Sequence, residues 1–463
     1  MNSPFFWIIL PAVASVLLLL AQQERTRFFL FSGASLFFAL STFLIKIDPI
    51  GEVAFYEIEM RSELPILGRN FILAETDIFL IRLVYLFNAI WGIFAYFFRH
   101  DNRIVPLGLL FSSMLLAAYA VTPFLYAALI IALAVILSIP LISNNQNKRA
   151  SGVSRFLIYQ ALALPFILLA GWFLAGGEVT PVSPEQLIQA TLLLGLGFIL
   201  WLGVFPFHSW IPLLYREEKP INLGYILQLL VTIIFLLILK FTNGFSWLRQ
   251  YSLFFDAMLL LGIIMADLGS AGIVFQKNLN DMSGYAFLHM VGMLLVTLGL
   301  YPGMEALVFP SMLSIFLINV SLLHISLVYL GSESKAVSYQ MLKTEEWNIS
   351  ALFGFVFALF SISGMPLTIG FPPTQWIYQN LYRSNLIFFW FLILSKIFIT
   401  FSALKLMKIM YDKTKNLTEI LPKQTRDWVL FILIISVILI GSFSQGVYRN
   451  FDQLLAGFEN LIQ

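Results

Sequence analysis

Long apolar runs follow one another along almost the whole chain, from residue 5 to residue 446. A helix needs about 20 mostly apolar residues to cross the hydrocarbon core of a bilayer, and the sequence holds about fourteen runs of that kind. They are predicted to be helices at 5–21, 28–46, 78–98, 104–121, 123–142, 154–175, 188–204, 223–242, 253–274, 283–301, 306–330, 350–382, 386–411 and 427–446. Only 11% of the residues are charged, against about 25% in soluble domains. The sequence therefore predicts an all-α polytopic membrane protein with about 14 transmembrane helices.

The distribution of Lys and Arg predicts the orientation of these helices. When the N-terminus is placed outside, the inside loops and adjoining span ends hold clearly more Lys and Arg than the outside segments, as the positive-inside rule requires. Both termini are then expected on the outer side. No basic residue precedes the first apolar run, so we interpret it as a transmembrane helix rather than a cleaved signal peptide.

The longest polar insert, residues 48–77, is expected on the outer side of the membrane. It contains two stretches in which apolar and polar residues alternate, VAFYEIE and NFILA, with LPILG between them. This alternation predicts a short external β-hairpin.

The composition excludes several kinds of chemistry on this chain. Because there is no cysteine, structural disulfides, cysteine-ligated iron–sulfur clusters and a thiol nucleophile are excluded. The four histidines (His100, His208, His289 and His324) do not have the spacing of metal ligands, and there is no glycine-rich phosphate loop. With a net charge of +2, nucleic acid is not an expected partner. We expect no cofactor, no metal and no catalytic site on this chain.

Two apolar runs are interrupted by helix-breaking residues. The first reads VFPFHSWIPL (204–213) and the second SISGMPLTIGFPP (361–373), so the predicted breaks lie at Pro206 and at Gly364, Pro366, Pro372 and Pro373. Breaks at corresponding positions of two halves are typical of inverted-repeat transporters. The alternative is that the prolines simply end a span and that His208 lies in the following loop.

The paired breaks predict the organisation of the chain. Two inverted five-helix repeats, each with one broken helix, are expected at 104–242 and 253–411. Residues 1–103 are then three N-terminal helices with the external hairpin, and 412–463 hold the last helix and a tail.

Three stretches in order carry a family resemblance. FPFHSWIPLLY resembles the VPFHxWxPDxY signature of the antiporter-like, proton-translocating membrane subunits of respiratory complex I. QKNLNDMSGYAFLHMVG resembles their QxxxKRxLxYSSIxHxG segment, and SISGMPLTIGF resembles their SLxGxPxTxGF. A weaker similarity is FILAETDIFLIRLVYLF at 71–87. Within this family the chain resembles subunit N, called subunit 2 in mitochondria; similar subunits occur in membrane-bound hydrogenases and multisubunit cation/proton antiporters.

The resemblance implies proton translocation that is driven by redox chemistry in a separate arm. It also implies buried charges: a glutamate in span 5, lysines in spans 7 and 8, and a lysine or glutamate in span 12. In this sequence all four positions are neutral, namely Val135, Trp201, one of the residues 230–232, and Thr374. The basic pair of QxxxKR is replaced by Asn280 and Asp281.

Other ionisable residues lie in or near the predicted spans. They suggest an alternative proton path through His208, Asp267, His289, His324 and Lys396. Equally, each could be satisfied by a neighbouring helix or reach the membrane interface. Tyr119, Tyr126 and Trp201 are interpreted as packing residues.

Three functions are compatible with these observations. The first is a membrane-arm subunit of a complex I-like NADH/quinone oxidoreductase-type assembly whose own proton channel is degenerate and whose role is structural or coupling. The second is an active proton or cation/proton antiporter subunit that uses non-standard residues. The third is a free-standing small-solute carrier. The first implies other membrane subunits and the bilayer as partners, contacts through 48–77 or 331–347, and a bacterial cytoplasmic or organellar energy-transducing membrane.

Overall fold

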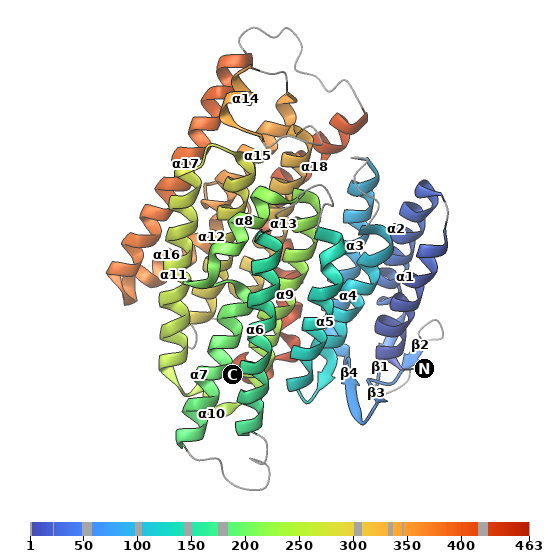
Figure 1. Ribbon diagram of the computed structural model, residues 1–463. Coiled ribbons are helices and arrows are strands. Elements are labelled where there is room, and N and C mark those ends of the chain that lie inside the picture. Colours follow the sequence, from blue (N-terminus) through green and yellow to red (C-terminus); the bar gives the residue numbers. More distant parts are fainter. Residues whose placement is uncertain are drawn as a thin grey trace.

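Helices lying side by side make up nearly all of the computed structural model, which describes residues 2–21, 23–48, 58–97, 104–142, 151–174, 184–300, 308–331, 337–344, 347–414 and 425–462 (Figure 1). In chain order the helices are η1 Phe5–Ile9, α1 Leu10–Leu20, α2 Glu24–Ser41, η2 Glu75–Asp77, α3 Ile78–Phe97, α4 Ile104–Ala120, α5 Leu125–Ile142, α6 Ser151–Leu174, α7 Pro184–Leu202, η3 Phe207–Ser209, α8 Trp210–Glu217, α9 Pro220–Gly244, α10 Ser246–Arg249, α11 Ser252–Phe275, α12 Leu279–Gly299, α13 Val308–Leu330, α14 Tyr339–Thr344, α15 Ile349–Ile362, α16 Phe371–Ser384, α17 Leu386–Thr414, α18 Thr425–Ser442, α19 Ser444–Phe451, η4 Asp452–Gly457 and α20 Glu459–Ile462.

The helical membrane fold predicted from the apolar runs is confirmed. Among the described residues, nine helices are long and apolar enough to cross a membrane, or ten if the pair Trp428–Ser442 and Ser444–Gly457, bent by 83°, counts as one. Three further apolar helices are shorter, at Phe5–Leu20, Leu107–Ala120 and Ile349–Ile362.

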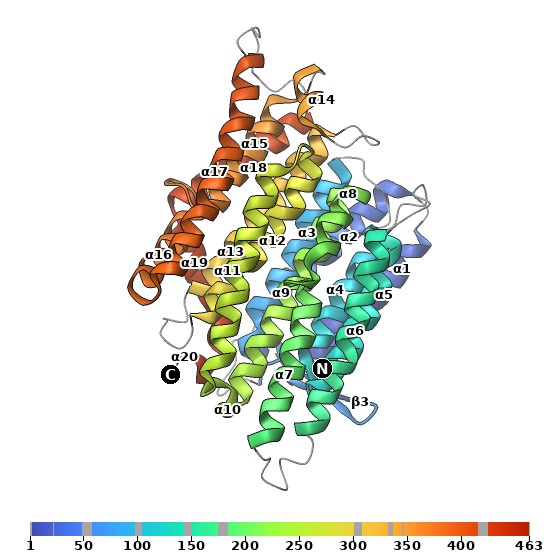
Figure 2. The same ribbon diagram turned by 60° about the vertical axis from the view of Figure 1, so that its left-hand side comes forward.

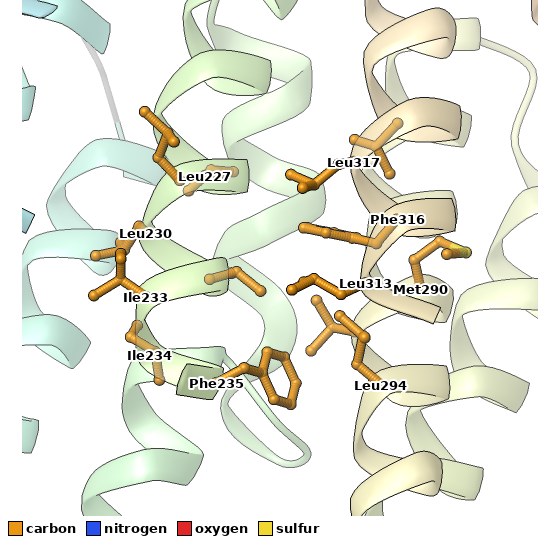
Figure 3. Close-up of a cluster of buried hydrophobic side chains, with 14 of the residues drawn as sticks. Leu227, Leu230, Ile233, Ile234, Phe235, Met290, Leu294, Leu313, Phe316 and Leu317 are labelled. Carbon is orange, nitrogen blue, oxygen red and sulfur yellow. The ribbon is translucent and has the colours of Figure 1, made fainter. Parts of the chain in front are cut away.

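The centre of the bundle is formed by α9, α12 and α13. The whole apolar window of α9 and 94% of that of α12 are buried, against 22% for α6 and 28% for α17. Figure 3 shows how apolar side chains of these central helices meet, with Phe235 of α9 on one side and Leu313 and Phe316 of α13 on the other. Since lipid is as apolar as these side chains, such a core is held mainly by close van der Waals packing.

Glycines bring α11 and α12 into close contact. A Cβ atom on Gly269 would lie 2.5 Å from the backbone nitrogen of His289, and one on Gly299 would lie 2.3 Å from that of Leu259. Small residues that let two backbones approach are a common feature of membrane helix pairs. This contact fixes the relative position of the two helices that carry Asp267 and His289.

Both predicted breaks are present between helices. The first break, residues 203–209, separates α7 from α8 and contains η3 and Pro206. The second break, residues 363–370, separates α15 from α16, contains Pro366, and begins with Gly364 at φ +68°. Pro372 and Pro373 lie in the first turn of α16, where a missing N–H costs nothing, so they start a helix rather than interrupt one.

Short strands lie at one end of the bundle, close to the N-terminus (Figure 1). β1 Ile45–Ile47 pairs in parallel with β2 Ile58–Met60. β3 Glu63–Ile66 pairs antiparallel with β4 Arg69–Ile72, which also pairs antiparallel with β5 Val121–Thr122.

The predicted register of the hairpin is wrong. We expected LPILG to be the turn, but Leu64–Ile66 belong to β3, and the turn lies at Leu67 and Gly68. Both turn residues have positive φ, +51° and +73°, as the tight turn between two antiparallel strands requires. Part of VAFYEIE lies outside the described residues, and its end pairs with β1 instead.

The C-terminal tail folds back over the same end of the bundle. After α18 the chain bends, and the Tyr448 hydroxyl of α19 donates to the carbonyl of Ile369 in the second break. Asn460 of α20 bonds to Asn243 at the end of α9 through its backbone nitrogen at 3.0 Å and its side-chain nitrogen at 3.1 Å. The tail thus connects the second break with the central helix.

Candidate functional site

The second break carries a lysine from a neighbouring helix. Lys396 Nζ, from the middle of α17, donates to the carbonyl oxygen of Gly364 at 3.2 Å. The same nitrogen lies 5.6 Å from the ring centroid of Tyr378 in α16. The ammonium is therefore held between the two halves of the broken span, within the range of a cation–π contact.

His289 connects the helix segments that carry Asp267 and Lys396. His289 Nδ1 is 3.0 Å from the carbonyl oxygen of Ala266 and 3.2 Å from Ser395 Oγ, which are the chain neighbours of Asp267 and Lys396. Three of the five residues of the predicted alternative path, carried by α11, α12 and α17, thus occupy one region.

Asp267 and Lys396 do not form an ion pair. Among the described residues no carboxylate oxygen lies within 4.0 Å of Lys396 Nζ, and the buried Oδ1 of Asp267 has no hydrogen-bond partner. A buried carboxylate oxygen without a partner is costly and is often found at functional sites.

His324 lies in a different place, behind the first break. Its Nε2 is 2.7 Å from the hydroxyl of Tyr215 in α8, and its Nδ1 is 2.5 Å from the carbonyl oxygen of Val320. The ring packs on Gly224 of α9, where a Cβ would lie 2.8 Å from it. With both nitrogens bonded, this histidine ties α13 to the second half of the broken span.

Among the described residues, His208 forms no hydrogen bond with either of these two groups. It lies half-buried in η3 within the first break, with its ring stacked on Phe205 at 6.1 Å between centroids. Its Nδ1 is buried and has no hydrogen-bond partner. The five residues of the predicted path therefore fall into three separate locations.

The positions of the family charges are closely packed. Val135, Trp201, Leu230 and Thr374 expose 2%, 1%, 0% and 2% of their surface. Trp201 accepts a bond at its carbonyl from Gln160 Nε2 at 2.8 Å, and Thr374 Oγ1 donates to the Gly370 carbonyl at 2.7 Å. Leu230 lies in the apolar core of Figure 3.

Two further charged clusters were not anticipated from the sequence. Asp77 accepts from the Tyr119 hydroxyl at 3.0 Å, while Lys240 Nζ donates to the Tyr119 carbonyl at 2.7 Å. Tyr119 is thus more than the packing residue that we expected, because it joins η2, α4 and α9. The lysine and aspartate lie 163 positions apart in the sequence, and no sequence signal connects them.

The second of these clusters is an ion pair between α8 and α12. Arg216 contacts the carboxylate of Asp281 through Nε at 3.1 and 3.3 Å and through Nη2 at 3.0 Å. Asp281 occupies a position where the resemblance implies a basic residue, and it forms an ion pair with Arg216. In the part of the chain that the structure describes, no three His, Asp or Glu side chains gather as a metal-ligand set would.

Comparison with known proteins adds a family and a fold. Residues 108–400 match the family described as NADH:quinone oxidoreductase/Mrp antiporter, TM. NADH-ubiquinone oxidoreductase chain 2 of Sylvisorex granti is 23% identical over 254 residues, which are 53% of this chain and 67% of that protein. The chain covers between 40% and 68% of the length of four curated relatives, two named NADH-ubiquinone oxidoreductase chain 2 and two named NAD(P)H-quinone oxidoreductase chain 4.

Two solved structures share the fold over its whole length. A chain of the membrane-bound sulfane sulfur reductase, an archaeal respiratory membrane complex, has a TM-score of 0.79 at 13% identity and is matched over 100% of this chain and 98% of that chain. A chain of respiratory complex I from Thermus thermophilus has a TM-score of 0.73 at 18% identity and is matched over 99% and 100%.

Proposed function

The chain belongs to the family of NADH:quinone oxidoreductase and Mrp antiporter transmembrane proteins, and from this premise we propose that it is a membrane-arm subunit of a complex I-like, proton-pumping assembly. Its partners are then other membrane subunits and the lipid of a bacterial or organellar energy-transducing membrane. The proposal places no cofactor and no catalytic site on this chain.

The proposed topology has fourteen spans with both termini outside. The nine long helices, the bent pair, the three shorter helices and α2 together supply fourteen. The two ends of the chain lie at the same end of the bundle, as an even number of spans requires (Figures 1 and 2). Within this topology 104–242 and 253–411 are the two inverted repeats, flanked by 1–103 and 412–463, and the strands of 48–77 are external.

We propose further that the chain's own proton channel is degenerate, so that its role is structural or coupling. The observation that carries this proposal is the close packing at the four family charge positions, where Val135, Trp201, residues 230–232 and Thr374 expose at most 2% of their surface. None of these side chains is charged, and a proton crosses a low-dielectric interior only through titratable groups or ordered water.

An active channel is the second candidate, because Asp267, His289 and Lys396 share one region and Asp267 Oδ1 lacks a partner. In that case Asp267 would hold the transported proton. His208 and His324 lie elsewhere and would not belong to this path.

One experiment separates the two candidates. The assembly is purified from native membranes in mild detergent, its subunits are identified by mass spectrometry, and it is reconstituted into vesicles for proton-translocation assays. Asp267→Asn is compared with Asp256→Asn, a change at an exposed aspartate of the same helix. A degenerate channel predicts that both variants pump within about twofold of wild type, a change of less than about 0.5 kcal/mol.

A loss of tenfold or more in Asp267→Asn alone would refute the degenerate channel and support the active one. Purification of the chain without redox or antiporter subunits would refute the proposed assembly and favour a free-standing carrier.

A further inference from the structure

We propose that Lys396 supplies, from α17, the positive charge that is missing from position 374 of α16, and that its ammonium group is the positioning cation of the second break. Lys396 would have this role in an active and in an inactive channel alike. The charge of the second repeat is then relocated to another helix rather than lost.

The first observation is the carbonyl group that Lys396 binds. Gly364 has φ +68° and lies two residues beyond the end of α15, where backbone carbonyls no longer have intrahelical partners. A cation is stabilised at such a C-terminal end by the helix dipole and by the free carbonyls. The 3.2 Å bond from Lys396 Nζ to the Gly364 carbonyl uses this position.

The second observation is that position 374 lies against the same glycine. A Cβ atom on Gly364 would be only 2.1 Å from Thr374 Oγ1 and 2.9 Å from Thr374 Cβ. The Thr374 side chain therefore packs directly on the residue whose carbonyl the ammonium binds. A lysine at position 374 would start beside this carbonyl, and its four-carbon stem is flexible enough to reach it.

The third observation is the surroundings of the ammonium group. Tyr378 is one helical turn after Thr374 and presents its ring 5.6 Å from Lys396 Nζ. The neighbouring Ser395 contacts His289 of α12. The carbonyl dipole and the aromatic face both favour a positive charge between α15 and α16, whichever helix carries it.

Helix α17 also contains a lysine that serves as a matched control. Lys405 is exposed and its Nζ lies 4.5 Å from the Tyr339 ring centroid, away from the break. Removing its charge changes the same helix by the same chemistry but leaves the Gly364 carbonyl untouched.

The test removes the charge at position 396 and places a lysine at position 374 instead. The melting midpoint of the purified assembly is measured for Lys396→Met, Thr374→Lys, the double variant and the control Lys405→Met. We expect Lys396→Met to lower the midpoint by a few degrees and Thr374→Lys alone to lower it as well, because two cations then compete for one carbonyl. The double variant should recover at least half of the loss of Lys396→Met, while the control stays within 1 °C of wild type.

Additive losses in the double variant would overturn the proposal, because the two positions would then not share a site. An unchanged midpoint in Lys396→Met would overturn it too. If Lys396→Met does not fold, Lys396→Ala and Lys405→Ala are melted with and without ethylammonium, which should raise the midpoint of Lys396→Ala only. These readouts do not depend on proton pumping, so they succeed or fail independently of the proposed function.

Discussion

The ion pair between Arg216 and Asp281 allows a specific prediction, because its two side chains are buried to very different extents. The side chain of Asp281 exposes 3% of its surface, whereas that of Arg216 exposes 58%. Removing the arginine leaves a carboxylate buried without its partner, but removing the aspartate leaves an arginine that water can solvate. The two single substitutions should therefore have unequal costs.

The magnitudes follow from the contacts. A hydrogen bond to a charged group contributes about 1.5–3 kcal/mol, and solvent screens the exposed guanidinium, so Arg216→Met should lower the free energy of unfolding by about 2 kcal/mol. Asp281→Leu should cost about 1 kcal/mol or less, mainly through the lost interaction of the acid with the first turn of α12. The double variant should be more stable than Arg216→Met alone, with a coupling of at least about 1 kcal/mol.

The assay is equilibrium unfolding in mixed micelles, followed by tryptophan fluorescence, for the two single variants and the double variant. Arg155→Met, a change at an exposed arginine of α6, is the control and should stay within about 0.5 kcal/mol of wild type. The reasoning is refuted if the double variant is no more stable than Arg216→Met, because the buried carboxylate would then not be the source of the cost.

Three further substitutions test the packing of the bundle. Leu230→Lys places an ammonium in the apolar core of Figure 3 and should cost more than about 3 kcal/mol or prevent folding, measured as the yield of folded protein; a well-folded variant would contradict a dry centre. Gly299→Ala forces a Cβ to within 2.3 Å of the backbone nitrogen of Leu259 and should lower the melting midpoint clearly, whereas Gly195→Ala, with nothing within 4 Å, should leave it equal or higher. Lys240→Met removes a 2.7 Å bond to the carbonyl end of α4 and should cost about 1–2 kcal/mol by the same assay; no change would show that the bond contributes nothing.

Much of the local structure could be predicted from residue patterns. The apolar runs marked the helices, because a run of that length is a property of consecutive residues. Pro206 and Gly364 marked the two breaks, because a missing N–H and a positive φ act on the backbone where they occur. The hairpin register was predicted wrongly, since alternation shows that strands exist but the turn at Leu67 and Gly68 decides which residues pair.

The candidate site was less predictable. Asp267, His289 and Lys396 were recognised individually as unusual in apolar helices, but nothing in the sequence showed that they lie together and apart from His324. The loss of a family charge at position 374 was visible from the resemblance, whereas the ammonium of Lys396 at the neighbouring Gly364 carbonyl was not. A motif compares residues at fixed positions along the chain. It therefore cannot detect a charge that is supplied from a different helix.

The sequence by itself determined that this chain is a helical membrane protein, where its helices run and break, and which family it resembles, because hydrophobic length, helix breakers and motifs are read along the chain. Only the tertiary structure decided which charges have partners. The residues of each charged group come from different helices, such as Gly364 with Lys396 and Arg216 with Asp281. In a low-dielectric interior those partners decide whether a charge is stable, and packing between helices alone brings them together.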